Sequence, residues 1–443
     1  LVADLLASHY SGTRRMVLRA QVGFAPAHQG THVLPPTPQS HLTSTVTRGL
    51  EIADHETHEV QIPKGSHAVK ILHAADLHID SPLGGLTAYE GAPAEEIRGA
   101  TRRATENLIQ AALDHEVSLV VLAGDIFDGD WPDYSTGLFW NEQLGRLHAA
   151  GIPVVSVAGN HDAQSQISRH LQLPPNVTQL SASKPQTVTF DDLGVEVIGQ
   201  GYATRDVNVD LTEAYPRGDP NLFSIGLLHT ALNGRPGHAN YAPASVEALR
   251  AKGYQYWALG HVHTREIVHS DPWIVFPGNI QGRHAREIGP KGATLLTVEG
   301  GAVAKVEPLI LDDVRWDLCA IDATQCASAD DVRSAVAERF SAITADADGR
   351  LAAVRVEIAG SSPAHAELWA NRHGFEADIR SLANNGGRLW VEKVKVSTTR
   401  PVDLAAARDD DAVGALAQRI SELRGDPDAL AAYEDDFADL TKK

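Results

Sequence analysis

The sequence predicts an α/β fold, and three observations lead to this prediction. Five short apolar runs, several of them rich in β-branched residues, are typical of strands buried on both faces of a sheet. They span residues 69–75, 118–123, 152–158, 223–228 and 256–259. Between the first two runs, residues 94–117 carry apolar side chains at approximately helical spacing, which predicts a connecting helix. Each run leads into polar residues, as expected at the carboxyl edge of an α/β sheet, where ligands gather.

Four parts are expected along the 443 residues. Residues 1–68 are rich in His, Thr, Ser and Pro without a sustained period, which predicts a disordered extension. This extension is interpreted as dispensable or as an over-long reading frame, and not as a signal peptide. The main α/β domain is expected over residues 69–312, a smaller α+β domain over 313–400 and an acidic helical tail over 401–443.

Hydrophobic patterning predicts the elements of the last two parts. In the smaller domain, strands are expected at residues 316–321, 351–358 and 388–396, and helices at 328–343 and 364–383. In the tail, helices are expected at residues 411–423 and 427–440. The sequence therefore predicts a small βαβαβ unit followed by two short helices.

Five segments at the strand ends carry side chains that ligate metals. They are Asp76-Leu77-His78, residues 124–128, residues 159–162, His229 and residues 260–263. Carboxylate, amide and imidazole ligands from several strands suit a pair of divalent cations, which hydrolysis of a phosphate ester needs.

The spacing of these residues assigns provisional roles. A tight turn can aim two residues that are two positions apart at one ion, as for the pair Asp76 and His78, and the pair His261 and His263 has the same spacing. Asp125 is the natural bridge between two ions. Asn160 and His229 would complete the second ion.

One histidine is left for acid–base chemistry. His161 is not needed as a ligand, so it is a candidate to protonate a leaving alkoxide. Asp128 could hydrogen-bond His161 and raise its pKa, or it could have a purely structural role. Asp80 and Asp162 are candidates for similar outer positions, and His73 is expected to be a core histidine.

The ordered pattern D-x-H, G-D-x-x-D, G-N-H-[DE], H and G-H-x-H across residues 76–263 resembles the calcineurin-like metallophosphoesterase superfamily. The resemblance implies a sandwich of two facing β-sheets with helices outside. It also implies two overlapping ligand sets that share Asp125. One set is Asp76, His78, Asp125 and His263, and the other is Asp125, Asn160, His229 and His261.

Residues 74–83, residues 276–284 and residues 289–292 resemble the YhaO-type branch of the SbcD-like DNA repair exonucleases. This resemblance implies cleavage of DNA phosphodiesters in double-strand-break repair and two divalent ions, with manganese preferred and iron, zinc or magnesium as alternatives. It also implies a coiled-coil ABC-type ATPase of the SMC class as partner, and a homodimer. Residues 313–400 would then be a capping domain or a plain accessory domain. The tail would dock on the ATPase or pack on the cap.

Basic residues near the last ligand offer a phosphate contact. Arg283 and His284 are candidates for substrate binding, and they and Lys291 could equally belong to an ordinary basic loop. Arg102 and Arg103 are expected to be solvated charges on a helix face.

Composition limits the function classes. A formal net charge of −19 argues against a surface that coats DNA non-specifically. Two cysteines and the lack of an apolar run of membrane length favour a reduced cytoplasmic protein without a membrane span. Three classes remain open, which are a metal-dependent DNA nuclease, a phosphodiesterase or phosphatase acting on a nucleotide or other small phosphoester, and a non-catalytic partner subunit.

Overall fold

The computed structural model describes residues 68–82, 93–130, 134–165, 171–234, 241–385, 388–401 and 412–425. The expected N-terminal extension, apart from its last residue, and the expected helix at residues 427–440 lie outside the described residues. Among the described helices, none is long and apolar enough to cross a bilayer.

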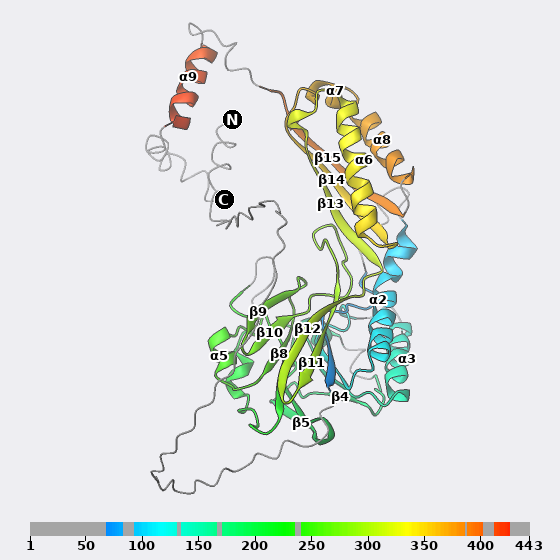
Figure 1. Ribbon diagram of the computed structural model, residues 1–443, viewed down its shortest axis with the longest axis vertical. Helices are drawn as coiled ribbons and strands as arrows, with labels where there is room; N and C mark the ends of the chain where they lie inside the picture. Colours follow the sequence, from blue (N-terminus) through cyan, green and yellow to red (C-terminus); the bar gives the residue numbers. More distant parts are fainter. Residues whose placement is uncertain are drawn as a thin grey trace, which may run out of the picture. The chain divides into compact units, whose positions relative to one another are not determined.

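The first β-sheet has six strands in the order β12-β11-β1-β2-β3-β4. Strands β1 to β4 are parallel, whereas β11 and β12 are antiparallel additions at the β1 edge. The strands are β1 (Val69–Ala74), β2 (Leu119–Ala123), β3 (Val154–Val157), β4 (Val177–Gln179), β11 (Gly292–Glu299) and β12 (Ala302–Ile310). Helices α2 (Ala94–Asp114) and α3 (Ser135–Ala149) pack side by side on its outer face (Figure 1).

The second sheet also has six strands, in the order β5-β6-β7-β8-β10-β9. Its strands are β5 (Gln186–Phe190), β6 (Val195–Gly199), β7 (Phe223–His229), β8 (Tyr256–Gly260), β9 (Glu266–Ser270) and β10 (Trp273–Phe276). The short helix α5 (Val246–Arg250) packs on its outer face, where Leu249 joins an apolar cluster with Trp257 and Phe276.

A continuous apolar core joins the two sheets face to face. Ile71 and Val121 of the first sheet pack with Val197, Ile225 and Ala258 of the second, and all five are fully buried. The expected sandwich of two facing sheets with helices outside is therefore confirmed. The parallel strands β1, β2 and β3 end at one edge, where they meet the carboxyl ends of β7 and β8.

A third sheet forms the smaller α+β domain. Its parallel strands are β13 (Val314–Asp322), β14 (Leu351–Ser361) and β15 (Leu389–Thr399), and one face is covered by α6 (Ala329–Asp346) and α8 (Arg372–Asn385) (Figure 1). The predicted βαβαβ order is confirmed. The predicted tail helix at residues 411–423 corresponds to α9 (Ala412–Gly425).

The prediction of one helix over residues 364–383 is wrong. The structure has α7 (His365–Ala370) and α8, separated at Asn371, whose backbone leaves the helical region at φ −135° and ψ 52°. The Asn371 side chain accepts a hydrogen bond from the Gly374 amide at 3.3 Å. Asn371 therefore caps the start of α8. The helix is interrupted there, although the apolar residues continue at helical spacing across the break.

The other face of the third sheet contacts the main domain. Trp316, Ala353 and Trp390 pack with Ile97 and Ala100 at the start of α2. The expectation that Arg103 is solvated is also wrong, because its Nε donates to Asp313 at 2.8 Å in the connection between the domains. Apolar burial and an ion pair thus hold the two domains together here.

We predict that Leu72→Ala lowers the free energy of unfolding by about 2–5 kcal/mol, because it opens a cavity in the fully buried cluster under α2 and α3. Leu138→Ala is the matched control, since the Leu138 side chain on α3 is 68% exposed, and it should change stability by less than about 0.5 kcal/mol. Urea unfolding followed by circular dichroism measures both. Equal effects would contradict the assignment of this cluster to the core.

Candidate metal centre

Two strained turns at the ends of β1 and β2 present the first candidate ligands. Asp76, His78 and Asp125 adopt left-handed backbone conformations, with φ of 53°, 44° and 53°. The Asp76 amide donates to the Gly124 carbonyl at 3.0 Å and the His78 amide donates to the Asp125 carbonyl at 3.1 Å, so the turns stay paired beyond the strands. Such conformations cost about 1–3 kcal/mol each and persist only where the surroundings enforce them.

Two glycines make room for these turns. Gly124 has a φ of 89°, and a Cβ there would lie 2.6 Å from Nδ1 of His229. A Cβ on Gly159 would lie 2.2 Å from Oδ1 of Asp125. Any larger residue at either position would displace a candidate ligand.

The structure brings the seven sequence-predicted ligands together. Potential ligand atoms lie within 4.8 Å of one another in three groups. The first group is Asp76, His78 and His263, and the second is Asp125, His229 and His261. A third group, His78, Asp125 and His161, overlaps both. The remaining residue, Asn160, opens the short helix α4 (Asn160–Gln164), and its Oδ1 lies 3.1 Å from Nε2 of His229. His261 and His263 face different groups, contrary to the expectation from spacing that both aim at one ion, and in agreement with the ligand sets that the family resemblance implies.

The first group fits a divalent cation. Nε2 of His78 and Nε2 of His263 are 3.2 Å apart. Two imidazole nitrogens that each bind one ion at about 2.1 Å are separated by roughly 3–3.4 Å, so this spacing is that of neighbouring ligands. Asp76, with 1% exposure, is the carboxyl group of this set. Burial raises its pKa, and a bound cation would favour the ionised form.

The second group fits a cation equally well. His229 donates from Nδ1 to the Ala123 carbonyl at 2.8 Å, which turns Nε2 toward Asn160 and Asp125. Burial lowers the pKa of His229, but the charges of Asp125 and Asp76 outweigh burial and raise it to about 9. This fully buried position therefore favours a positive charge.

Asp125 lies between the two groups. Its Oδ2 is 3.4 Å from Nε2 of His229 and 4.0 Å from Nε2 of His78. Burial alone would raise the pKa of Asp125, but the neighbouring histidines hold it below its usual range. An ionised carboxylate that faces both groups could share its oxygens between two ions.

His161, a member of the third group, forms a hydrogen-bonded pair with Asp128. Nδ1 of His161 lies 2.8 Å from Oδ1 of Asp128, and this contact raises the pKa of His161 against the effect of burial. Ser81 donates to the other Asp128 oxygen at 2.6 Å. Because Nδ1 is engaged, Nε2 is the ring nitrogen of His161 that can meet a substrate.

The basic stretch after β10 divides into residues with different surroundings. Arg283 reaches the candidate centre, with Nη1 3.4 Å from Oδ2 of Asp128 and a side chain only 15% exposed. His284 is 57% exposed, and Nε2 lies 3.7 Å from Glu287 Oε1. Lys291 is buried and donates to the His263 carbonyl at 2.9 Å, so its role is structural and the phosphate interpretation is wrong for it.

Glu287 is the residue that the sequence analysis missed. Its Oε1 accepts a hydrogen bond from Nδ1 of His263 at 2.7 Å. The available signal was an acidic residue, Glu287, directly after the basic stretch Arg283–Arg286. Its partner is 24 residues away, so the contact could not be read from local spacing.

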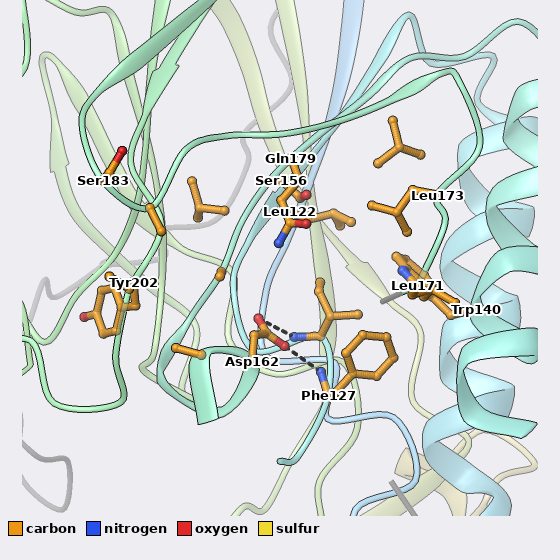
Figure 2. Close-up of a pocket in the computed structure, with 17 residues that line it drawn as sticks. Leu122, Phe127, Trp140, Ser156, Asp162, Leu171, Leu173, Gln179, Ser183 and Tyr202 are labelled. Carbon is orange, nitrogen blue, oxygen red and sulfur yellow. Dashed lines mark hydrogen bonds between the residues drawn. The ribbon is translucent and has the colours of Figure 1, made fainter. Parts of the chain in front are cut away.

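The outer carboxylates hold the ligand loops. Asp80 accepts two hydrogen bonds from Arg102, at 2.7 and 2.5 Å, so the expectation that Arg102 is a solvated charge is wrong. Asp162 accepts from the amides of Ile126 at 3.2 Å and Phe127 at 3.0 Å (Figure 2). It also accepts from the amide of Gly159 at 3.0 Å. Burial, followed by the charge of Asp125, raises the pKa of Asp162 to about 6.

Asp162 also lines a pocket of about 470 Å³ (Figure 2). Apolar side chains that include Leu122, Phe127 and Trp140 line it, and none of its described lining residues is a candidate ligand. His73 is also separate from the centre, because it is fully buried between Tyr256 and the Leu259 carbonyl, and burial lowers its pKa to about 3. The expectation of a core histidine is confirmed.

The two-sheet fold with buried carboxylates and imidazoles at its strand ends is that of a metal-dependent hydrolase. The calcineurin-like phosphoesterase family model matches residues 69–265, and the model for the middle domain of metallophosphoesterase YhaO matches residues 316–399. The uncharacterized metallophosphoesterase YhaO of Bacillus subtilis (strain 168) is 32% identical over 296 residues, which cover 66% of this chain and 72% of that protein.

Two relatives are named DNA double-strand break repair protein Mre11. The one from Methanopyrus kandleri is 26% identical over 375 residues, covering 76% of this chain and 74% of that protein. The one from Sulfurisphaera tokodaii is 27% identical over 248 residues, covering 52% and 60%. The chain belongs to the calcineurin-like metallophosphoesterase family, in the branch that also carries the YhaO middle domain. It is thus a phosphoester hydrolase of a family that binds divalent metals.

We predict that Asp125→Ala loses bound metal, because Asp125 belongs to the group of His229 and His261 and its carboxylate also lies 4.0 Å from Nε2 of His78 in the first group. Elemental analysis of the purified, metal-loaded chain gives the number of ions per chain. Asp192→Ala removes an exposed carboxylate elsewhere and should leave that number unchanged. Retention of two ions by Asp125→Ala would contradict the bridging position.

Proposed function

We propose that this chain is a dinuclear-metal phosphodiester hydrolase whose substrate is DNA. Asp76, His78 and His263 would hold one ion, and Asn160, His229 and His261 would hold the other, with Asp125 shared. The observation that carries the proposal is the presence of two adjacent ligand groups, which are linked by the third group that contains His78, Asp125 and His161. Two bound divalent ions would supply positive charge to the phosphoryl oxygens and activate water for attack.

His161 would act as the general acid. Its Nδ1 is held by Asp128 at 2.8 Å, and the raised pKa keeps a larger fraction of the imidazole protonated near neutral pH. The side chain is 32% exposed, so it is accessible to a substrate. Donation of that proton to the leaving alkoxide would lower the barrier to breaking the P–O bond.

Arg283 would bind the phosphate. Its Nε is buried and has no hydrogen-bond partner among the described residues, whereas its terminal nitrogens face Asp128 and Glu287. A buried donor without a partner is costly, and a substrate oxygen would satisfy it. His284, being exposed on the same loop, would contact the substrate farther from the ions.

The DNA substrate is proposed from similarity to proteins named for double-strand break repair. From the resemblance to the SbcD-like exonucleases we propose manganese as the metal, a coiled-coil ABC-type ATPase as partner and self-association as a homodimer. From the two cysteines and the lack of an apolar run of membrane length we propose a cytoplasmic location. The third sheet would act as the capping domain that limits access to the centre. An ATPase partner would also supply the basic track that a chain of net charge −19 lacks.

The alternative substrate is a nucleotide or other small phosphoester. It is favoured by the net charge of −19 and by the engagement of nearby basic side chains. Arg102 and Arg103 are paired with carboxylates, and Lys291 is buried on a carbonyl, so none of the three offers an unengaged charge to a polyanion.

We predict that His161→Ala retains both ions but lowers kcat by about 10²–10⁴-fold, the usual contribution of a positioned acid. Turnover of bis-p-nitrophenyl phosphate with manganese measures the loss, and elemental analysis checks the ions. His148→Ala, at an exposed position on α3, should leave both quantities unchanged. Unaltered turnover in His161→Ala would refute the general-acid assignment.

The substrate is tested with end-labelled duplex and single-stranded DNA, beside a cyclic nucleotide and bis-p-nitrophenyl phosphate. We expect manganese-dependent release of nucleotides from DNA that disappears in His161→Ala. If only the small diesters are hydrolysed, and addition of a coiled-coil ABC-type ATPase from the same organism does not restore DNA cleavage, the DNA proposal is wrong and the alternative substrate stands.

A further inference from the structure

Glu287 is a buried carboxylate with a complete set of partners at the edge of the candidate centre. It is 8% exposed, and Oε1 accepts from Nδ1 of His263 at 2.7 Å. Oε2 accepts from the backbone amide of Arg283 at 2.8 Å and from the side-chain amide of Asn279 at 3.0 Å. One carboxylate thus connects a candidate ligand to the backbone of the loop that carries the proposed phosphate-binding arginine.

This contact determines which way the His263 ring faces. With Nδ1 on Glu287, the opposite nitrogen Nε2 lies 3.2 Å from Nε2 of His78, inside the first ligand group. A carboxylate that accepts from the far nitrogen of a ligating imidazole fixes its tautomer and orientation and increases its basicity. Glu287 is therefore placed to act on metal binding without touching the ion.

The same loop is fastened to the capping domain. Nε1 of Trp316, on β13, donates to the Gly282 carbonyl at 2.9 Å, and the Gly289 amide donates to the Trp316 carbonyl at 2.9 Å. Nε2 of Gln281 donates to the Val314 carbonyl at 2.6 Å. The loop is thus held by β13 before and after Glu287.

The packing inside the loop is close. A Cβ on Gly282 would lie 2.7 Å from the Glu287 carbonyl oxygen and 3.0 Å from Cδ1 of Trp316. The backbone that carries Glu287 therefore has little room to move unless β13 moves with it. A displacement of the cap strand would reach His263 through one loop and one hydrogen bond.

We propose that Glu287 is a positioning residue for His263 and Arg283, and that through its loop the capping domain fixes one of the two ions. This inference rests on the proposed function, because it requires that His263 is a ligand. It assigns the capping domain a second role besides limiting access, namely support of the ligand set of a single ion.

The test is manganese titration of the full chain by isothermal calorimetry, with electron paramagnetic resonance of the bound Mn²⁺ as a second readout. The variants are Glu287→Gln, Glu287→Asp and Glu287→Ala, with Glu299→Gln as a charge-matched control at an exposed position. We expect Glu287→Gln to weaken one ion by about 10–100-fold and to leave the other unchanged. Glu287→Asp should recover part of the affinity, because it keeps the charge.

Trp316→Phe tests the connection to the cap. It removes the indole donor to Gly282 and keeps the aromatic packing, so we expect a smaller weakening of the same ion. Thermal unfolding without metal checks that each variant folds. If Glu287→Ala does not fold, the test relies on Glu287→Gln, which is closest in shape to glutamate.

The outcomes separate the two proposals. If the parent chain binds fewer than two ions, the proposed dinuclear function fails and this inference fails with it. If the parent binds two ions and Glu287→Gln binds both as tightly, only this inference is overturned. Equal weakening of both ions would also overturn it, because a general loosening of the fold would then explain the effect.

Discussion

The candidate centre depends on one constraint, which is the pairing of the turns that follow β1 and β2. Parallel strands normally diverge into separate loops, but here the hydrogen bonds from Asp76 to Gly124 and from His78 to Asp125 continue the pairing past the last strand residues. The isolated bridge between Ile79 and Phe127 extends it further. Left-handed backbone conformations that would be unfavourable alone are thereby maintained, and the carboxylates lie close before any ion binds.

The buried charges explain how the rest of the site is arranged. Asp76 and Asp125 are each 1% exposed, so their negative charge has to be balanced inside the protein. Histidines from both sheets surround them, and the charges of Asp125 and Asp76 raise the pKa of His229 to about 9 against the effect of burial. Divalent ions would satisfy the same demand, so metal binding should also stabilise the folded chain.

The third sheet contacts the main domain next to the candidate centre. The start of α2 packs on Trp316 and Trp390 of the third sheet, and the loop after β10 lies between the centre and β13. The basic residues predicted to contact phosphate therefore have different partners. Arg283 points to Asp128, whereas Lys291 is committed to the His263 carbonyl.

The sequence by itself determined the α/β class, the strands that lead into the ligand motifs and the seven candidate ligands, because each motif is local and follows an apolar run of strand length. Edge strands such as β4, with partly exposed residues, carried too weak a pattern to be predicted. Only the tertiary structure decided that Asn371 divides a helix and that Glu287 contacts His263. It also places His261 and His263 in different groups, as the family resemblance implied and local spacing did not. These outcomes depend on contacts between distant segments or on a cap that competes with periodicity, and hydrophobic spacing encodes neither.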